Sequence, residues 1–91
     1  MKLGCHVSIA GSVDKAVDRA QKIGCNTFQV FTRSPRMWRY REFRQEEIEA
    51  FRRKRSDAGI SPVFSHMPYL PNLSSSNPEP YRKSVETLRL E

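Results

Sequence analysis

Short apolar runs and helical repeats of apolar residues alternate along this chain of 91 residues. The runs are too short for helices and fit β-strands, whereas apolar residues that recur at three- and four-residue steps fit amphipathic helices. Strands are predicted at residues 2–7, 26–31 and 60–65, and helices at residues 12–23, 44–58 and from residue 77 onward. The predicted order is therefore βαβαβα.

Local signals mark the helix ends. Ser12 is placed to be the N-cap of the first helix, and Gly24 and Gly59 stand where left-handed C-caps would end the first two helices. Asn77 followed by Pro78 has the form of an N-cap with proline at the first helical position. These signals fix the boundaries more closely than periodicity alone.

Two of the helices carry further expectations. The helix over residues 44–58 has its glutamates first and a basic run at residues 52–55, an order that complements the helix dipole. The basic run is predicted to be a solvated face. The last helix is predicted to present an apolar face made by Tyr81, Val85 and Leu88.

The order of elements predicts an α/β fold. Right-handed connections would make the three predicted strands parallel, and parallel strands occur with helices on both faces or in a closed barrel. Three strands do not close a barrel, and the chain ends at Glu91 inside a predicted helix. Residues 1–91 are therefore expected to be a single partial domain, the first three β/α units of a larger (β/α) protein.

Composition limits the core and indicates the kind of partner. Only 37% of the residues are hydrophobic, so a modest core is expected. A formal net charge of +6 favours a polyanionic partner, nucleic acid first, with a solvated basic surface as the alternative. No apolar run approaches the ~20 residues of a membrane span, and no signal peptide is evident, so a cytoplasmic protein without a membrane partner is expected.

The two cysteines do not have the spacing of a metal site. Cys5 and Cys25 fall in apolar, strand-like runs, far from a pattern such as C-x₂-C. We interpret them as buried thiols in a reducing compartment and expect no disulfide.

His66 is the first candidate for chemistry. It stands at the end of the third apolar run, before a loop punctuated by prolines, and parallel α/β proteins collect active-site side chains at such strand ends. A neutral imidazole there suits a metal ion, although zinc needs three or four ligands and the chain has two histidines. A structural role is the alternative for His66. His6, at another strand end, could lie nearby or be a hydrogen-bonded core residue.

Two loops suit nucleic acid. Residues 31–41 interleave four arginines with Trp38 and Tyr40, and guanidinium groups pair with phosphates while planar rings stack on exposed bases. The alternative is an ordinary basic surface loop with Trp38 folded back onto the core. Residues 67–73 contain prolines that would hold Tyr69 and Leu70 outward as a wedge between bases. The alternative is that the leucines of this loop only anchor it.

Three segments together resemble a known family. They are residues 4–8 (GCHVS) with 10–12 (AGS), residues 28–38 (FQVFTRSPRMW) and residues 66–73 (HMPYLPNL), each following a predicted strand. In order and spacing the chain resembles the amino-terminal third of endonuclease IV, the zinc-dependent apurinic/apyrimidinic endonuclease family of base-excision repair. The resemblance covers essentially the whole chain.

The resemblance implies a fold and an activity. The fold class would be α/β, a βαβαβα portion of a TIM (β/α)₈ barrel that is incomplete in this chain. The family hydrolyses the phosphodiester bond 5′ to abasic sites in duplex DNA, leaving 3′-hydroxyl and 5′-deoxyribose-phosphate ends. Three zinc ions at the carboxyl ends of the strands activate a hydroxide and stabilise charge on the phosphate.

The resemblance also implies roles for four residues. His66 matches a zinc ligand, and Arg36 matches an arginine that enters DNA from the minor-groove side. Tyr69 and Leu70 match side chains that fill the gap left by a flipped abasic nucleotide. No ligand role is carried over to His6, and no catalytic residue is assigned in this chain. The other zinc ligands of the family belong to later strands, so an incomplete metal site and an inactive isolated chain are expected.

Two other functions stay open. The chain could be a module that binds abasic or distorted DNA without cleaving it, or part of a sugar isomerase from the related metal-dependent barrels. The arginine-rich loop argues against the isomerase because a small neutral sugar carries no negative charge for the arginines to bind. No obligate protein partner is evident, and the apolar surfaces of an incomplete barrel favour self-association of the chain.

Overall fold

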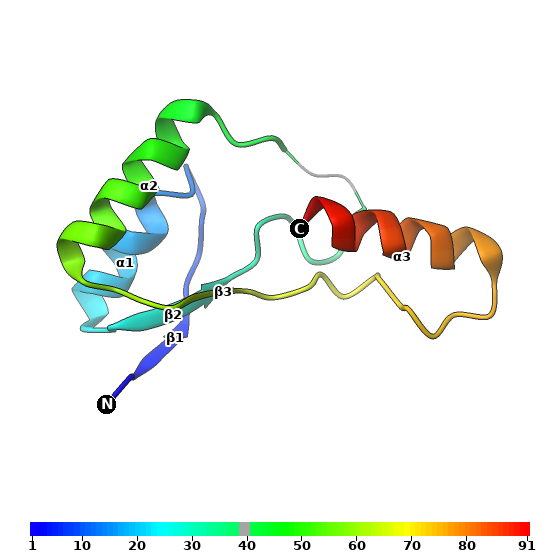
Figure 1. Ribbon diagram of the computed structural model, residues 1–91, viewed down its shortest axis with the longest axis horizontal. Coiled ribbons are helices and arrows are strands. Elements are labelled where there is room, and N and C mark those ends of the chain that lie inside the picture. The colour runs from blue at the N-terminus through cyan, green and yellow to red at the C-terminus, as the bar shows by residue number, and fades with distance from the viewer. Residues whose placement is uncertain (39–40) are drawn as a thin grey trace.

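The computed structural model describes residues 1–38 and 41–91 and shows the predicted order of elements. Arg39 and Tyr40, which belong to the predicted basic loop, lie outside the described residues. In chain order the elements are β1 (Gly4–His6), α1 (Lys15–Ile23), β2 (Thr27–Val30), α2 (Gln45–Ala58), β3 (Val63–Ser65) and α3 (Pro78–Leu90), as Figure 1 shows. Each strand is shorter than the apolar run that predicts it.

The three strands form one parallel sheet whose order follows the chain, β1-β2-β3. Cys5 lies opposite Phe28 in the first pair, and Gln29 lies opposite Phe64 in the second. In a doubly wound sheet the strand order reverses about the first strand, whereas a barrel adds each strand beside the last one. The sequential order therefore fits a portion of a barrel.

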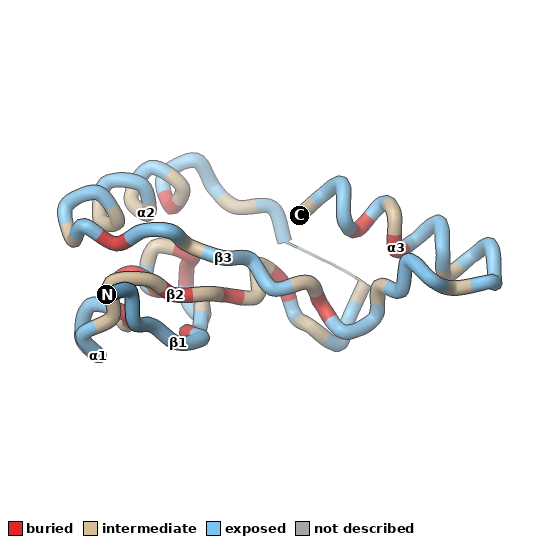
Figure 2. Tube along the Cα trace, turned by 60° about the horizontal axis from the view of Figure 1, so that its bottom comes forward, coloured by how far each residue is buried: buried red, intermediate tan, exposed pale blue. Residues whose placement is uncertain are grey.

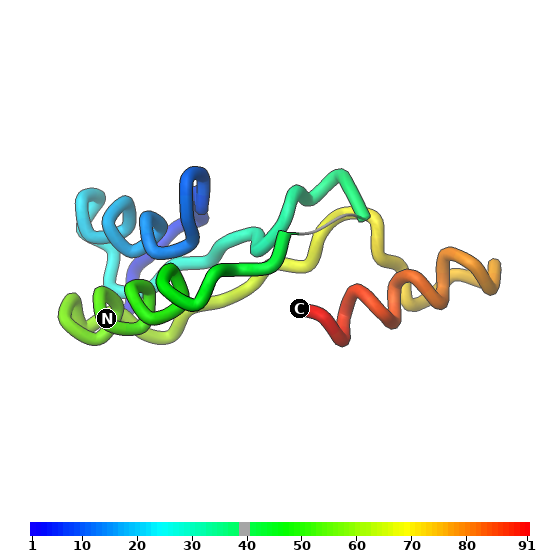
Figure 3. The backbone as a smooth tube through the Cα atoms, turned by 90° about the horizontal axis from the view of Figure 1, so that it is seen from above, coloured from blue at the N-terminus to red at the C-terminus, as the bar shows by residue number. Residues whose placement is uncertain are grey.

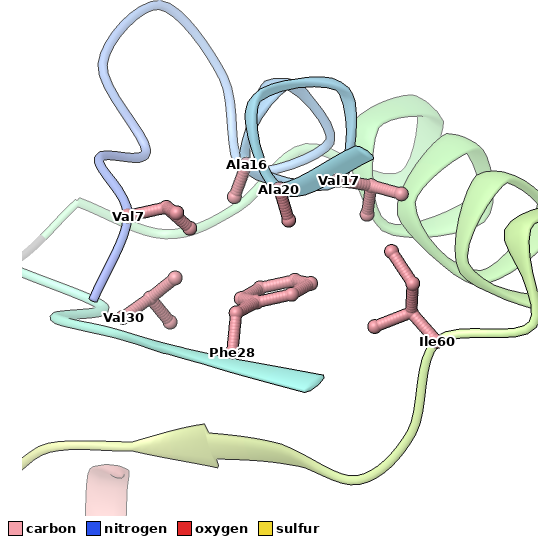
Figure 4. Close-up of a cluster of buried hydrophobic side chains, with 7 residues drawn as sticks. All are labelled: Val7, Ala16, Val17, Ala20, Phe28, Val30 and Ile60. Carbon is pink, nitrogen blue, oxygen red and sulfur yellow. The ribbon is translucent and has the colours of Figure 1, made fainter. Parts of the chain in front are cut away.

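The core lies between the sheet and the first two helices. Figure 4 shows Ala16, Val17 and Ala20 of α1 facing Phe28 and Val30 of β2. The Phe28 ring also lies 6.3 Å from the ring of Phe51 on α2, so one side of β2 packs against both helices. Phe64, on the other side of the sheet, is exposed. Coverage of one face by helices is the arrangement of a barrel wall.

Most of the predicted helix ends are confirmed, and one is wrong. Gly24 and Gly59 have φ of 94° and 65° and end α1 and α2 in the left-handed conformation. The Asn77 side chain accepts a hydrogen bond from the amide of Glu79 at the start of α3. However, α1 begins at Lys15, since residues 12–14 form a turn in which the Ser12 hydroxyl donates to the carboxylate of Asp14.

The last helix lies apart from the other two. Figures 1 and 3 show α3 at the end of the molecule away from α1 and α2. Figure 2 shows that most of α3 is exposed. Tyr81 and Leu88 of its predicted apolar face are exposed, whereas the buried residues of the helix are Ser84 and Thr87. The hydroxyl of the buried Ser84 accepts a hydrogen bond from the amide of Asn72 at 2.7 Å.

Two expectations about individual side chains need correction. Cys5 is exposed instead of buried, because β1 is an edge strand of the described sheet, and Cys25 is half-buried. The basic run of α2 is only partly a solvated face, since Lys54 donates to Asp14 at 2.7 Å and to Asp18 at 2.8 Å. Within the described part of the chain, no helix has the length and apolar content needed to cross a membrane.

Candidate nucleic-acid interface and metal ligand

Four rings gather at the carboxyl ends of the strands, and we call them the aromatic cluster: His6, Phe31, His66 and Tyr69. Phe31 directly follows β2, and its ring centroid lies 4.5 Å from that of His6, 4.9 Å from that of His66 and 5.4 Å from that of Tyr69. The carboxyl ends of β1, β2 and β3 therefore meet around Phe31. The expectation that His6 could lie near His66 is met, with a centroid distance of 6.3 Å.

The imidazole of His66 is oriented by its own loop. Its Nδ1 lies 2.6 Å from the carbonyl oxygen of Met67. Because a carbonyl can only accept, this contact places the proton on Nδ1 and leaves Nε2 with its lone pair. A hydrogen bond from the second ring nitrogen is the usual device that orients a metal-binding histidine. The exposed ring of His66 is thus prepared to act as one ligand through Nε2.

The described residues do not complete a metal site. Among them, no group of three or more histidine, cysteine, aspartate or glutamate side chains is close enough to hold an ion. Zinc takes three or four protein ligands. His66 therefore fits a zinc ion as a single ligand, and the set as a whole does not enclose one.

The loops that carry Arg36 and Tyr69 are joined through their backbones. The amide of Tyr69 donates to the carbonyl of Pro35 at 2.8 Å. The loop that carries Tyr69 is therefore attached to the residue directly before Arg36. The side chains of Tyr69 and Leu70 are 61% and 39% exposed, and Arg36 is exposed as well. Leu73 is also exposed, which does not fit the alternative that the leucines only anchor the loop. The structure brings the predicted DNA-contacting residues to the carboxyl end of the sheet.

A cleft of about 760 Å³ separates the loop after β1 from the loop after β2. Its lining includes Ser8, Gly11, Phe31, Arg33 and Met37. The cleft borders the aromatic cluster through Phe31, so the first loop of the barrel end shares a surface with the basic loop. Trp38 is half-buried beside the cation of Lys83, whose Nζ lies 5.7 Å from the ring centroid, and is not folded onto the core between the sheet and α1.

A buried ion pair fixes the end of the basic loop next to β2. The carboxylate of Glu91 lies 3.1 Å from Nη2 of Arg33, and the two side chains are 8% and 3% exposed. The same carboxylate accepts from the hydroxyl of Thr32 at 2.7 Å and from that of Ser65 at 3.2 Å. The side chain of Glu91 thus connects the carboxyl ends of β2 and β3 through Thr32 and Ser65, which are the sequence neighbours of Phe31 and His66.

A second buried carboxylate fixes the other end of the basic loop. Glu47, 3% exposed, accepts from both terminal nitrogens of Arg41 at 3.0 and 3.1 Å and from the amide of Val13 at 3.1 Å. The hydrogen bonds from Arg41 lower the pKa of Glu47 to about 2, against the opposing effect of burial. Glu47 therefore remains ionised and connects the basic loop to the segment before α1.

Sequence patterns did not reveal Glu47, Glu91 or the central position of Phe31. A weak signal exists for Glu47, which stands three residues after Arg44 at the position of a capping-box glutamate. No local signal marks Glu91, because its partner Arg33 is 58 residues away in the chain. By contrast, the position of His66 at a strand end and that of Arg36 in the loop after a strand follow from the predicted order of elements.

The sequential parallel sheet, the helices on one face and the side chains collected at the carboxyl ends of the strands define a segment of a (β/α) barrel. The family profile described as xylose isomerase-like TIM barrel matches residues 17–91, and the chain belongs to that family. The predicted fold class, a partial TIM barrel, is confirmed.

Within this family the chain is similar to endonuclease IV. It is 49% identical over 90 residues to the probable endonuclease 4 of Cenarchaeum symbiosum, with 97% of this chain and 32% of the relative covered. It is 54% identical over 86 residues to the probable endonuclease 4 of Methanoculleus marisnigri, covering 94% and 30%. The crystal structure of endonuclease IV from Thermus thermophilus matches with a TM-score of 0.91 at 42% identity, covering 97% of this chain and 33% of that one. The resemblance drawn from the three motifs is confirmed, and the chain spans about a third of the length of these relatives.

Proposed function

We propose that residues 1–91 supply the first three β/α units of a DNA-repair endonuclease. The proposed reaction is hydrolysis of the phosphodiester bond 5′ to an abasic site in duplex DNA, giving 3′-hydroxyl and 5′-deoxyribose-phosphate ends. The observation that carries the proposal is the meeting of His66, Arg36 and Tyr69 at one end of the sheet, through the aromatic cluster and the Tyr69–Pro35 hydrogen bond. The similarity to proteins named endonuclease 4 supports the same reaction class.

Zinc is the proposed cofactor, and His66 would hold one ion through Nε2. When bound, zinc supplies a Lewis acid that lowers the pKa of water and neutralises charge on a phosphate. Since no group of three ligands exists among the described residues, the remaining ligands would come from other strands of the barrel. We therefore expect the 91-residue chain alone not to incise DNA.

The proposed substrate is duplex DNA with an abasic site, and the exposed side chains suit it. Arg36 offers a guanidinium group to the phosphate backbone. Tyr69 and Leu70 would fill the space in the base stack from which the abasic nucleotide is turned out. An abasic nucleotide has no base to unstack, so turning it out costs less than flipping a normal nucleotide, and this difference favours abasic sites.

A chimera tests the proposal. Residues 1–91 would replace the corresponding third of the Thermus thermophilus endonuclease IV, to which they are 42% identical. We expect the chimera to nick duplex DNA 5′ to a single abasic site with zinc and not with a chelator. His66→Ala should lower both the bound zinc and the incision rate, the rate by about 100-fold or more. His6→Ala serves as the matched control for bound zinc and should retain it.

Two results would contradict the proposal. A chimera that folds, as shown by circular dichroism, but leaves the abasic strand intact would exclude the activity. Incision by the 91-residue chain alone would exclude the incomplete metal site.

A non-catalytic DNA-binding module is the second candidate, favoured by the absence of a three-ligand group among the described residues. It predicts binding to abasic duplex that persists in chelator, together with an inactive chimera.

A further inference from the structure

The two thiols of the chain face each other across the edge of the sheet. Cys5 lies in β1 and Cys25 lies two residues before β2, and their Sγ atoms are 3.7 Å apart. Both are free thiols, and Cys5 is exposed. Cys5 is the middle residue of β1 and Cys25 precedes β2, and the function proposed above assigns a role to neither thiol. Twenty residues of sequence separate them, so only the fold brings them together.

The backbone on both sides of the pair is fixed by hydrogen bonds. The amide of Leu3 donates to the side-chain oxygen of Asn26 at 2.7 Å, and the amide of Asn26 donates to the carbonyl of Leu3 at 3.1 Å. The amide of Cys25 donates to the carbonyl of Ala20 at 2.9 Å. The segments that carry the two thiols are therefore held in register before any bond forms between them, and a disulfide would order little additional chain.

The sulfur atoms have to approach each other before a bond forms. A disulfide requires a sulfur–sulfur distance of roughly 2 Å, and the two sulfur atoms are 3.7 Å apart in the reduced chain. Cys5 is exposed, so a molecule as small as hydrogen peroxide can reach it.

We propose that Cys5 and Cys25 form an oxidisable dithiol site that closes to an intramolecular disulfide with a two-electron oxidant of the peroxide class. One thiolate attacks a peroxide oxygen, the O–O bond breaks, and the sulfur becomes a sulfenic acid as the first water leaves. The second thiolate attacks this sulfur, the S–O bond breaks, and a second water leaves as the S–S bond forms. The two thiols lose two protons and two electrons, and one hydrogen peroxide becomes two waters.

The hydrogen bond between the two thiols affects how readily the pair reacts. This bond raises the pKa of the Cys5 thiol, which keeps it protonated at neutral pH. Because the thiolate is the attacking species, this lowers the rate at which the pair reacts with peroxide at neutral pH. The product links β1 to the start of β2 one residue before His6, and so fixes the strand that carries one ring of the aromatic cluster.

The test uses the 91-residue chain treated with excess hydrogen peroxide. We expect intact-mass spectrometry to show the loss of two hydrogen atoms, thiol titration to fall from two groups to none, and a non-reducing digest to contain the peptide that joins Cys5 to Cys25. The closed loop should raise the thermal midpoint by about 10 °C, and dithiothreitol should reverse the change. Cys5→Ser and Cys25→Ser are the matched controls. Each keeps one thiol and should show neither the internal cross-link nor the shift in midpoint.

Three outcomes would overturn the inference. Mass increases from oxygen atoms on Cys5 without a cross-link would show that the partner thiol does not reach the sulfenic acid. Disulfides found only between two chains would show the same. Two unreacted thiols after prolonged treatment would show that the oxidant does not reach the pair. These readouts need no DNA or zinc, so a failure of this inference can be distinguished from a failure of the proposed endonuclease activity.

Discussion

At the scale of single residues, the buried carboxylate of Glu47 has the largest expected effect on stability. It accepts three of its hydrogen bonds from Arg41 and Val13, and the arginine holds its pKa at about 2, below the ordinary value of 4.5. Glu47→Gln keeps the size but loses the charge, and we expect it to lower the free energy of unfolding by about 1–3 kcal/mol at neutral pH. Urea denaturation followed by circular dichroism measures this change.

The same residue predicts a dependence on pH. Because the folded pKa of Glu47 is lowered, its stabilisation is fully present above about pH 4.5 and is lost as the pH falls toward about 2. Glu47→Gln should therefore be less sensitive to acid than the parent chain over this range. Glu46→Gln, in the same turn but exposed, is the control and should change stability by less than about 0.5 kcal/mol. Equal acid sensitivity of the parent and of Glu47→Gln would contradict the assignment.

The residues that sequence could and could not predict differ in the range of their contacts. Gly24, Gly59 and Asn77 act on their own helix ends, so their residue types and positions were sufficient. The partners of Glu47 include Val13, 34 residues away, and those of Glu91 include Arg33, 58 residues away. Such pairs depend on how elements pack, which periodicity does not encode. The roles proposed for His66 and Arg36 came from the family resemblance, and only their places, at a strand end and in the loop after a strand, came from the pattern.

At the scale of elements, the position of α3 depends on Glu91, the residue that follows the helix. The helix lies apart from α1 and α2 (Figure 1), and its carboxyl end is held to β2 and β3 by Glu91. We expect Glu91→Gln to lower the free energy of unfolding by about 1–3 kcal/mol, because it removes the negative charge that lies 3.1 Å from the buried guanidinium group of Arg33. The rate of amide hydrogen exchange should increase in α3, and it should increase less in α1.

A control and an opposing result define this test. Glu86→Gln removes an exposed carboxylate from the same helix, 3.4 Å from Arg89, and should change exchange little because exposed ion pairs contribute little to stability. If Glu91→Gln left the exchange of α3 unchanged, the helix would be held by its other contacts, chiefly the Ser84 hydroxyl on the Asn72 amide. The prediction that α3 has an apolar face says nothing about this attachment, because the contacts of Glu91 and Ser84 described above are polar.

At the scale of the whole molecule, the effect of overall charge on DNA binding can be separated from the effect of where each arginine lies. The formal net charge of +6 predicts binding to DNA that weakens with salt, whatever the site. Arg36→Ala and Arg53→Ala remove the same charge, but Arg36 lies beside the Tyr69 loop and Arg53 is exposed on α2. We expect Arg36→Ala to weaken binding to abasic duplex by about tenfold, and Arg53→Ala by much less. Fluorescence anisotropy with labelled abasic and intact duplexes over a range of salt measures both effects. Equal losses for the two variants would show that overall charge alone attracts the DNA and that Arg36 has no special place in the interface.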